Sequence, residues 1–129
     1  MHRAVLKLFT LSLLLWLPQV NAATVVKFSR VWSAQDYTRL TLESKKAIRH
    51  NMFSLSDPDR LVIDLDGVRL SKAITDLPKL IGSDDPYIKN IRVGRFKPGV
   101  VRLVLDLKAD VKPQPPRNSG GTCGASGVF

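Results

Sequence analysis

Two groups of arginine and aromatic residues are the part of this 129-residue sequence whose chemistry suits a ligand. The first group consists of Arg30, Trp32, Tyr37 and Arg39. Aromatic faces beside cations suit sugar rings that carry acidic peptides, because a guanidinium group pairs readily with a carboxylate. The alternative is that Trp32 and Tyr37 close one end of a folded domain. The sequence favours neither interpretation over the other.

The second group is basic and surrounds one predicted hairpin, with Arg92, Arg95, Lys97 and Arg102 close together along the chain. Charge at a solvated turn is common, so this group is the weaker indication of a binding site. Seven residues are therefore the candidates for ligand binding: Arg30, Trp32, Tyr37, Arg39, Arg92, Arg95 and Arg102.

No catalytic arrangement accompanies these groups. A hydrolytic zinc site needs about three His, Glu, Asp or Cys ligands and an open position for water. His50 is the only histidine after the first few residues, and Glu43 is the only glutamate in the chain. The adjacent Asp84 and Asp85 are interpreted as turn formers. The sequence predicts no catalytic residue, no metal and no cofactor in this chain.

The elements that must hold the candidate residues are predicted to be β-strands. Between residues 24 and 112, short alternating apolar runs are separated by turn residues. One run occurs three times, at residues 39–43, 60–65 and 102–107, each opening with arginine and carrying an acidic residue four positions later. Successive copies start 21 and then 42 residues apart, so the chain contains an internal repeat.

Alternation within the repeat assigns its two faces. Leu61, Ile63 and Leu65 share one side of a strand and should face the core, whereas Arg60 and Asp64 share the other. Arginine and carboxylate on neighbouring strands would pair and help to set the register, at about 0.2–1 kcal/mol per pair. This structural role is favoured over ligand contact for these charges.

The remaining elements complete an all-β prediction with one short helix. A partner strand is expected for each copy, at residues 25–32, 53–55 and 91–96. Pro98 and Gly99 suit a type II turn, since glycine accepts a positive φ cheaply. Ser71 is expected to cap a helix that runs through Leu77 and is ended by Pro78.

The first 22 residues have the layout of a secretory signal peptide. His2, Arg3 and Lys7 form a basic start, residues 8–17 carry no charge, and cleavage is expected after Ala22. The alternative is a retained anchor, but ten apolar residues rise only about 15 Å as a helix, roughly half the hydrocarbon thickness. The expected location is therefore the periplasm, with no transmembrane segment after cleavage.

The mature chain would hold 18 basic and 11 acidic residues, a net charge of +7. Export removes nucleic acid as a partner, and the charge favours adhesion to anionic polymers of the cell envelope. Residues 115–129 are rich in proline, glycine and serine and are expected to form a disordered tail after a domain at residues 23–114. No fourth repeat copy is visible. The domain should therefore lack its last hairpin and expose a sheet edge that allows self-association.

Four segments of the chain resemble the AMIN domain: residues 31–44, 56–65, 84–89 and 101–108. The resemblance implies a β-sandwich of two related sheets that binds peptidoglycan. This domain precedes the catalytic domain of periplasmic N-acetylmuramoyl-L-alanine amidases, zinc-dependent enzymes of cell-wall turnover and septum splitting. The resemblance implies peptidoglycan as the partner of this chain, with cell-division proteins as further candidate partners.

The sequence departs from the AMIN pattern in two places. The family continues past the position of Gln114 with another hairpin, and a zinc amidase domain with its His and Glu ligands should follow a linker. The leading hypothesis is a periplasmic peptidoglycan-binding module that carries no amidase activity itself. The alternative is an AMIN-type docking module of a secretin or of a pilus or export assembly.

Overall fold

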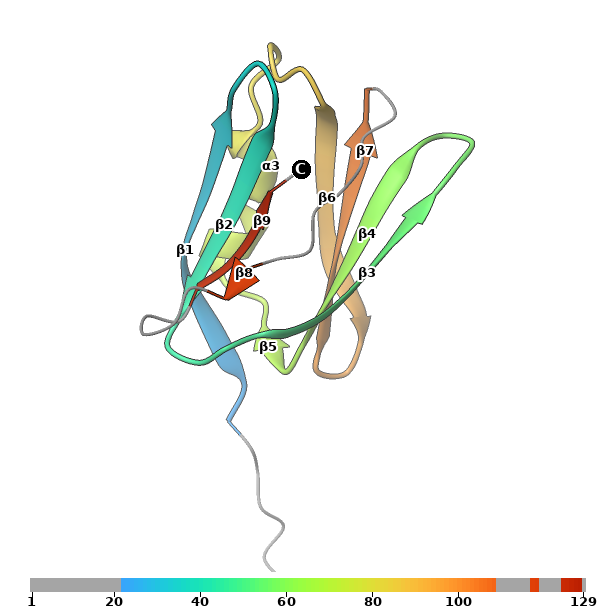
Figure 1. The fold of residues 1–129 in the computed structure, drawn as a ribbon. Coiled ribbons are helices and arrows are strands. Elements are labelled where there is room, and N and C mark those ends of the chain that lie inside the picture. The colour runs from blue at the N-terminus through green and yellow to red at the C-terminus, as the bar shows by residue number, and fades with distance from the viewer. Residues whose placement is uncertain (1–21, 109–116, 119–123, 129) are drawn as a thin grey trace, which may run out of the picture.

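The chain folds as a sandwich of two β-sheets that face each other, in a computed structural model that describes residues 22–108, 117–118 and 124–128 (Figure 1). The five-stranded sheet has the order β5-β1-β2-β9-β8, and the four-stranded sheet has the order β3-β4-β7-β6. The all-β sandwich of two sheets is confirmed. No helix among the described residues is long and apolar enough to span a membrane.

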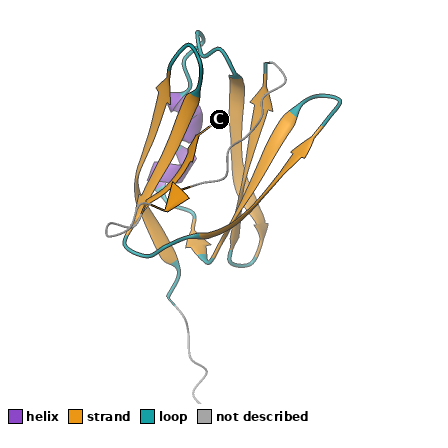
Figure 2. Ribbon diagram, viewed as in Figure 1, coloured by secondary structure: helices purple, strands orange, loops and turns teal. Residues whose placement is uncertain are grey.

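The sandwich is built mainly from hairpins of neighbouring strands (Figure 2). The elements are β1 (Thr24–Ser33), β2 (Thr38–Ser44), β3 (Arg49–Leu55), β4 (Arg60–Asp66), β5 (Val68–Arg69), α2 (Lys72–Thr75), α3 (Leu77–Leu80), β6 (Ile88–Lys97), β7 (Val100–Leu107), β8 (Arg117–Asn118) and β9 (Gly124–Val128). Neighbouring strands pair antiparallel, except for β5, which pairs parallel to β1. The expected turn at Gly99 is present, with a φ of 77°.

The three repeat copies occupy β2, β4 and β7, and the last two are direct neighbours. In their register Asp64 lies opposite Arg102, and Arg60 lies opposite Asp106. The repeat therefore brings an arginine of one copy beside the carboxylate of another, as the pairing prediction required.

The core lies between the sheets and follows the predicted alternation. Leu61, Leu65, Leu103 and Leu105 are at most 2% exposed, and they face the inner side of β2 across the sandwich. The buried core cluster consists of Val26, Leu40, Leu42, Ile48, Leu61, Ile63, Leu65, Val68, Ile74, Leu77, Ile88, Ile91, Val101, Leu103 and Leu105. The opposite faces of the strands are left to carry charge and aromatic rings.

The helical connection differs from the prediction. Two single-turn helices replace one, and Pro78 stands in the first turn of α3 instead of ending a helix. Proline is tolerated there because the first backbone N–H groups of a helix have no intrahelical partner. Ser71 stands at the N-cap position of α2, but its hydroxyl donates to the carbonyl of Val26 at 2.9 Å. Ile74 and Leu77 are fully buried, and α3 contacts both β1 and β6.

The end of the chain also differs from the prediction. The sequence predicts no strands in residues 115–129 and a missing last hairpin, whereas the structure has β8 and β9, with β9 antiparallel to β2. Strand pairing uses backbone N–H and C=O groups, so a glycine-rich segment without an apolar pattern can still pair with the free side of β2. The other residues of the predicted tail, and residues 1–21 of the predicted signal peptide, lie outside the described part of the chain.

Candidate functional site

The outer face of the four-stranded sheet carries an arginine between two aromatic rings. The guanidinium carbon of Arg102, on β7, lies 3.5 Å from the ring centroid of Phe96 and 5.7 Å from that of Phe53. Phe96 is 52% exposed and Phe53 is 36% exposed, so both rings remain open to solvent. We call Phe53, Asp64, Gly94, Phe96 and Arg102 the clamp face.

Asp64 fixes the orientation of the Arg102 side chain. Its two carboxylate oxygens accept hydrogen bonds from Nε at 2.8 Å and Nη2 at 2.9 Å of Arg102. The Arg102 hydrogen bonds hold the pKa of Asp64 below its usual range despite partial burial, and Asp64 in turn raises the pKa of Arg102. Nη1 makes no hydrogen bond to any described residue, so its N–H groups can donate to a ligand.

A hollow of about 270 Å³ lies beside the clamp. Its lining includes Arg92, Gly94, Phe96, Arg102 and Val104. Gly94 lies opposite Arg102 in the β6–β7 pairing, and a Cβ at Gly94 would meet no atom within 4 Å. Core packing therefore does not require glycine here, and its missing side chain keeps the hollow open.

Arg92 lies on the same face but is already paired. It donates to the two carboxylate oxygens of Asp106 at 2.9 and 3.1 Å, across β6 and β7. Its side chain is 56% exposed, so this pair is a surface contact that helps to align the hairpin.

The outer face of the five-stranded sheet carries a looser group, which we call the Trp32 face: Phe28, Arg30, Trp32, Tyr37, Arg39 and Glu43. Trp32 and Tyr37 meet edge to face with centroids 6.0 Å apart, and the Arg39 guanidinium lies 5.6 Å from the Tyr37 centroid and 6.0 Å from that of Trp32. Trp32 is 60% exposed. It therefore does not close the end of the sandwich, and that alternative is wrong for Trp32.

Charge pairing on the Trp32 face is weak. Arg30 approaches Glu43 only to 3.9 Å, with side chains 73% and 42% exposed. No described carboxylate forms an ion pair with Arg39, whereas Arg102 is held by two hydrogen bonds to Asp64.

The structure thus separates the seven candidates into three places. Arg30, Trp32, Tyr37 and Arg39 do gather on one face, while Arg92 and Arg102 lie on the opposite side of the sandwich. Arg95 lies opposite Val101, on the other side of β6 from Arg92, although it also lines the hollow that Arg92 and Arg102 line. Alternation along the hairpin could have separated Arg95 from Arg92 and Arg102.

Sequence reasoning missed the aromatic residues and the glycine of the clamp face. The position of Phe96 follows from a register shift between Arg95 and Lys97. Phe53 belongs to a different hairpin, so only the order of strands in the sheet brings it near Arg102. The alternation of the repeat did place Asp64 on this face, as the charged partner of a neighbouring strand.

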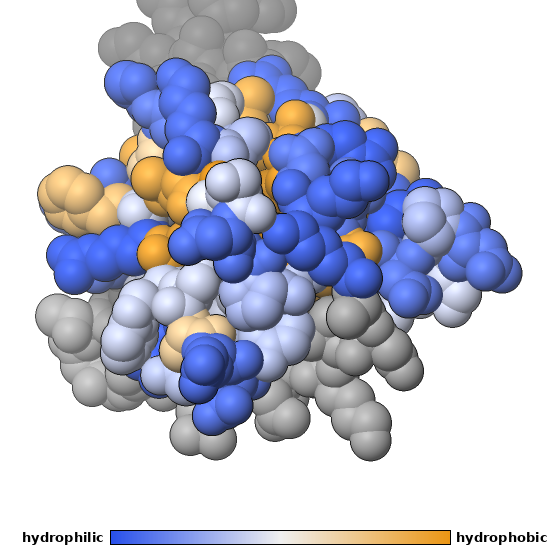
Figure 3. Space-filling model, turned by 90° about the horizontal axis from the view of Figure 1, so that it is seen from above, coloured by the Kyte–Doolittle hydropathy of each residue, from blue (hydrophilic) through white to orange (hydrophobic). Residues whose placement is uncertain are grey.

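Asp85 joins the two sheets, so the interpretation of it as only a turn former is incomplete. The carboxylate is 1% exposed and accepts hydrogen bonds from the Ser33 hydroxyl, from the Thr38 hydroxyl at 3.1 Å, and from the backbone N–H groups of Tyr87 and Ile88 at 2.9 and 2.8 Å. Burial alone would raise the pKa of Asp85, but these hydrogen bonds outweigh it and lower the pKa. Figure 3 looks onto this end of the sandwich, where most of the surface is hydrophilic.

The described residues do not offer a metal centre. Among residues 22–108, 117–118 and 124–128, no three His, Cys, Asp or Glu side chains lie close enough together to hold an ion. The zinc implied by the AMIN resemblance belongs to the amidase domain, and this part of the chain does not provide a ligand set for it.

Comparison with known proteins supports the resemblance seen in the sequence. The AMIN domain family matches residues 29–119. The chain is 45% identical over 105 residues to the N-acetylmuramoyl-L-alanine amidase AmiC of Escherichia coli O6:H1, covering 78% of this chain and 25% of that protein. It is 40% identical over 97 residues to AmiC of Neisseria meningitidis serogroup B, covering 75% of this chain and 22% of that protein. The chain therefore spans about a quarter of the length of these relatives.

Proposed function

Because the chain belongs to the AMIN domain family, we propose that it is a peptidoglycan-targeting module of an exported protein, of the kind that brings an N-acetylmuramoyl-L-alanine amidase to the cell wall. The similarity to two AmiC amidases favours this role over docking in a secretin assembly. The proposed location is the periplasm, and cell-division proteins are further candidate partners.

The clamp face is the observation that carries the proposal. Peptidoglycan combines sugar rings with short peptides that end in carboxylates. The exposed rings of Phe53 and Phe96 offer flat apolar surfaces for sugars, and the free Nη1 of Arg102 offers N–H donors for a carboxylate. Because Asp64 already holds the guanidinium, binding would cost little side-chain entropy.

Charge supports the same ligand at longer range. The mature chain would carry a net charge of +7, and Asp64 and Asp106 on this face are both paired with arginine. The carboxylates beside Arg92 and Arg102 are therefore already neutralised and repel an acidic polymer less than free ones would. This attraction should weaken as salt shortens the Debye length, which is about 8 Å at physiological ionic strength.

Co-sedimentation with insoluble peptidoglycan tests the proposal. Replacing Phe53 and Phe96 together with serine should reduce the bound fraction about tenfold or more, because aromatic anchors dominate binding energies. Both rings are already solvent-exposed, so the fold should survive. Leu80→Ser is the matched control, since Leu80 is 43% exposed and lies on α3, away from this face. Equal sedimentation of the double variant and the control would contradict a role for the clamp face, and no sedimentation of the wild type would contradict the function.

Export is tested separately. Mass spectrometry of a periplasmic fraction should find a mature N-terminus at Ala23, because the first 22 residues have the basic, apolar and small-residue layout of a signal peptide. A full-length product that stays in the cytoplasm would contradict the proposed location.

A further inference from the structure

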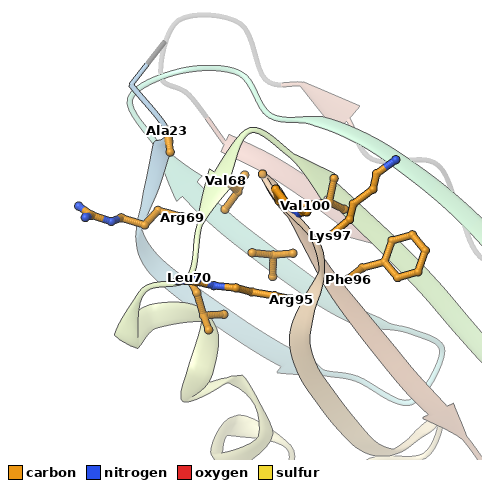
Figure 4. A pocket seen from close by; sticks show the side chains of 11 residues that line it. Ala23, Val68, Arg69, Leu70, Arg95, Phe96, Lys97 and Val100 are labelled. Carbon is orange, nitrogen blue, oxygen red and sulfur yellow. The ribbon is translucent and has the colours of Figure 1, made fainter. Parts of the chain in front are cut away.

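A second cavity opens between the two sheets, at the end of the sandwich where β5 approaches the β6–β7 turn (Figure 4). It has a volume of about 490 Å³, within the range of small-ligand sites. Val68, Val100 and Val101 form an apolar floor and are 4%, 7% and 1% exposed. A hydrogen bond from the Gly67 N–H to the Gly99 carbonyl, at 2.7 Å, ties the two turns together at this end. We call this cavity the β5–β6 pocket.

The charged residues of the pocket lining are all cations. They are Arg69, Arg95 and Lys97, and none of the described residues that line the cavity is acidic. Figure 4 shows the Arg95 side chain reaching from β6 across the cavity towards Leu70, whereas Arg69 points away from it. Arg95 makes no hydrogen bond or ion pair with any described residue. The pocket therefore holds an uncompensated positive charge over an apolar floor, which complements an anion with an apolar arm.

The pocket also lies between two strand edges. In the described part of the chain, β5 and β6 are the last strands on this side of their sheets, so their outer backbone groups have no strand partner. An extended peptide can pair with such an edge, while alternate side chains fill adjoining pockets. A sugar ring would leave both the backbone groups and the valine floor without a partner. A membrane surface would not reach into a concave site.

We propose that the β5–β6 pocket binds an extended peptide segment with small apolar side chains and a free carboxylate at its end. The carboxylate pairs with Arg95, and methyl-sized side chains rest on Val68, Val100 and Val101. Phe96 lines both this pocket and the hollow of the clamp face, so the two sites adjoin around the edge of β6. If the proposed function holds, one peptidoglycan fragment can place its sugars on the clamp face and its acidic peptide in the pocket.

Binding of acetyl-Ala-Ala-Ala, with a free C-terminal carboxylate or as the C-terminal amide, tests the proposal by NMR titration of the mature protein. The carboxylate form should shift the methyl signals of Val68, Val100 and Val101 and bind about tenfold more tightly than the amide, as expected for a charge-assisted contact. Arg95→Gln should remove this preference and Arg95→Lys should retain part of it. Lys89→Gln removes the same charge near the other end of β6 and should change nothing.

Equal binding of acid and amide, an unchanged preference in Arg95→Gln, or absence of shifts at the valine methyls would overturn the proposal. Binding to vesicles with anionic phospholipid but not to the tripeptide would overturn it in favour of a lipid surface. Shifts at the valine methyls and the effect of Arg95→Gln distinguish the pocket from the clamp face, where Arg102 also offers donors to a carboxylate. A wild type that sediments with peptidoglycan but ignores the tripeptide would contradict only the pocket, and the reverse result would contradict only the proposed function.

Discussion

The clamp face and the Trp32 face derive from copies of one repeat, yet they present their arginines differently. Arg102 is held by two hydrogen bonds to Asp64 and lies 3.5 Å from the ring centroid of Phe96. Arg39 has the equivalent place in its copy, but it touches its rings only at 5.6 and 6.0 Å and has no ion pair with a described residue.

The difference follows from what stands next to each strand. On the clamp face the neighbour of β7 is another copy of the repeat, so arginine meets carboxylate in register. On the Trp32 face, β2 lies between β1 and the short, glycine-rich β9, and neither of them is a copy of the repeat. The same sequence motif therefore holds its arginine by a carboxylate where two copies pair, and leaves it without an ion pair to a described residue where a single copy stands alone.

The largest expected loss of stability comes from removing the Asp85 carboxylate, which links the two sheets that carry these faces. Asp85→Ala should lower the free energy of unfolding by about 3–4 kcal/mol, because it leaves several buried donors at Thr38, Tyr87 and Ile88 without an acceptor. Urea unfolding measures this change, and peptidoglycan binding should fall with the folded fraction. A small loss, near that of a surface substitution, would show that the two sheets do not depend on this carboxylate.

Asp85→Asn provides the pH control for that prediction. Because the pKa of Asp85 is lower in the folded than in the unfolded protein, its stabilisation is complete above the unfolded pKa of about 3.9 and is lost as pH falls through the folded pKa. The stability difference between wild type and Asp85→Asn should therefore shrink below about pH 4. A difference that stays constant down to pH 2 would contradict the charged role of Asp85.

Comparing Arg102→Ala with Arg39→Ala tests the rigidity of the two faces directly. Arg102→Ala leaves the mostly buried carboxylate of Asp64 without its ion-pair partner and should lower the melting temperature by roughly 5–10 °C. Arg39→Ala removes an exposed side chain and should change the melting temperature by no more than about 2 °C. Similar shifts for both variants would remove the distinction between the faces.

Gly94→Val separates binding from stability on the clamp face. A side chain at Gly94 meets open space, so the strand should keep its stability or gain about 0.5 kcal/mol. The valine narrows the hollow beside Arg102 and should weaken peptidoglycan binding about fivefold to tenfold. Thr41→Val, on the outer side of β2, is the control, and equal binding by both variants would place the ligand elsewhere.

The smallest effect is expected on the Trp32 face. Replacing Arg30 and Arg39 together with alanine should weaken sedimentation with peptidoglycan about twofold to threefold, mostly at low salt, because exposed charges act through screened attraction. Binding measured at two salt concentrations checks this dependence. A loss of binding as large as that of the Phe53 and Phe96 double variant would show that the two faces contribute equally to peptidoglycan binding.

Sequence patterns alone predicted most of the strands, the core and the pairing of charges. Alternation in residues 60–65 and 102–107 placed Leu61, Ile63 and Leu103 inside and left Asp64 and Arg102 outside, because successive side chains of a strand point to opposite faces. The resemblance to the AMIN domain is carried by the same segments. The sequence prediction failed at Pro78 and at β9, where backbone geometry and pairing matter more than apolar pattern.

Which residues share a site depends on how the strands are arranged in space. Phe53, Phe96 and Arg102 come from three strands, and the strand order and one register shift bring them together. Arg95 lines a cavity only because β5, which is distant in sequence, lies across from it. The role of Asp85 could not be predicted from sequence either, because its donors at Ser33 and Thr38 are about fifty residues away along the chain. Local patterns report which way a side chain points, whereas contacts between distant segments depend on how the sheets are ordered and packed.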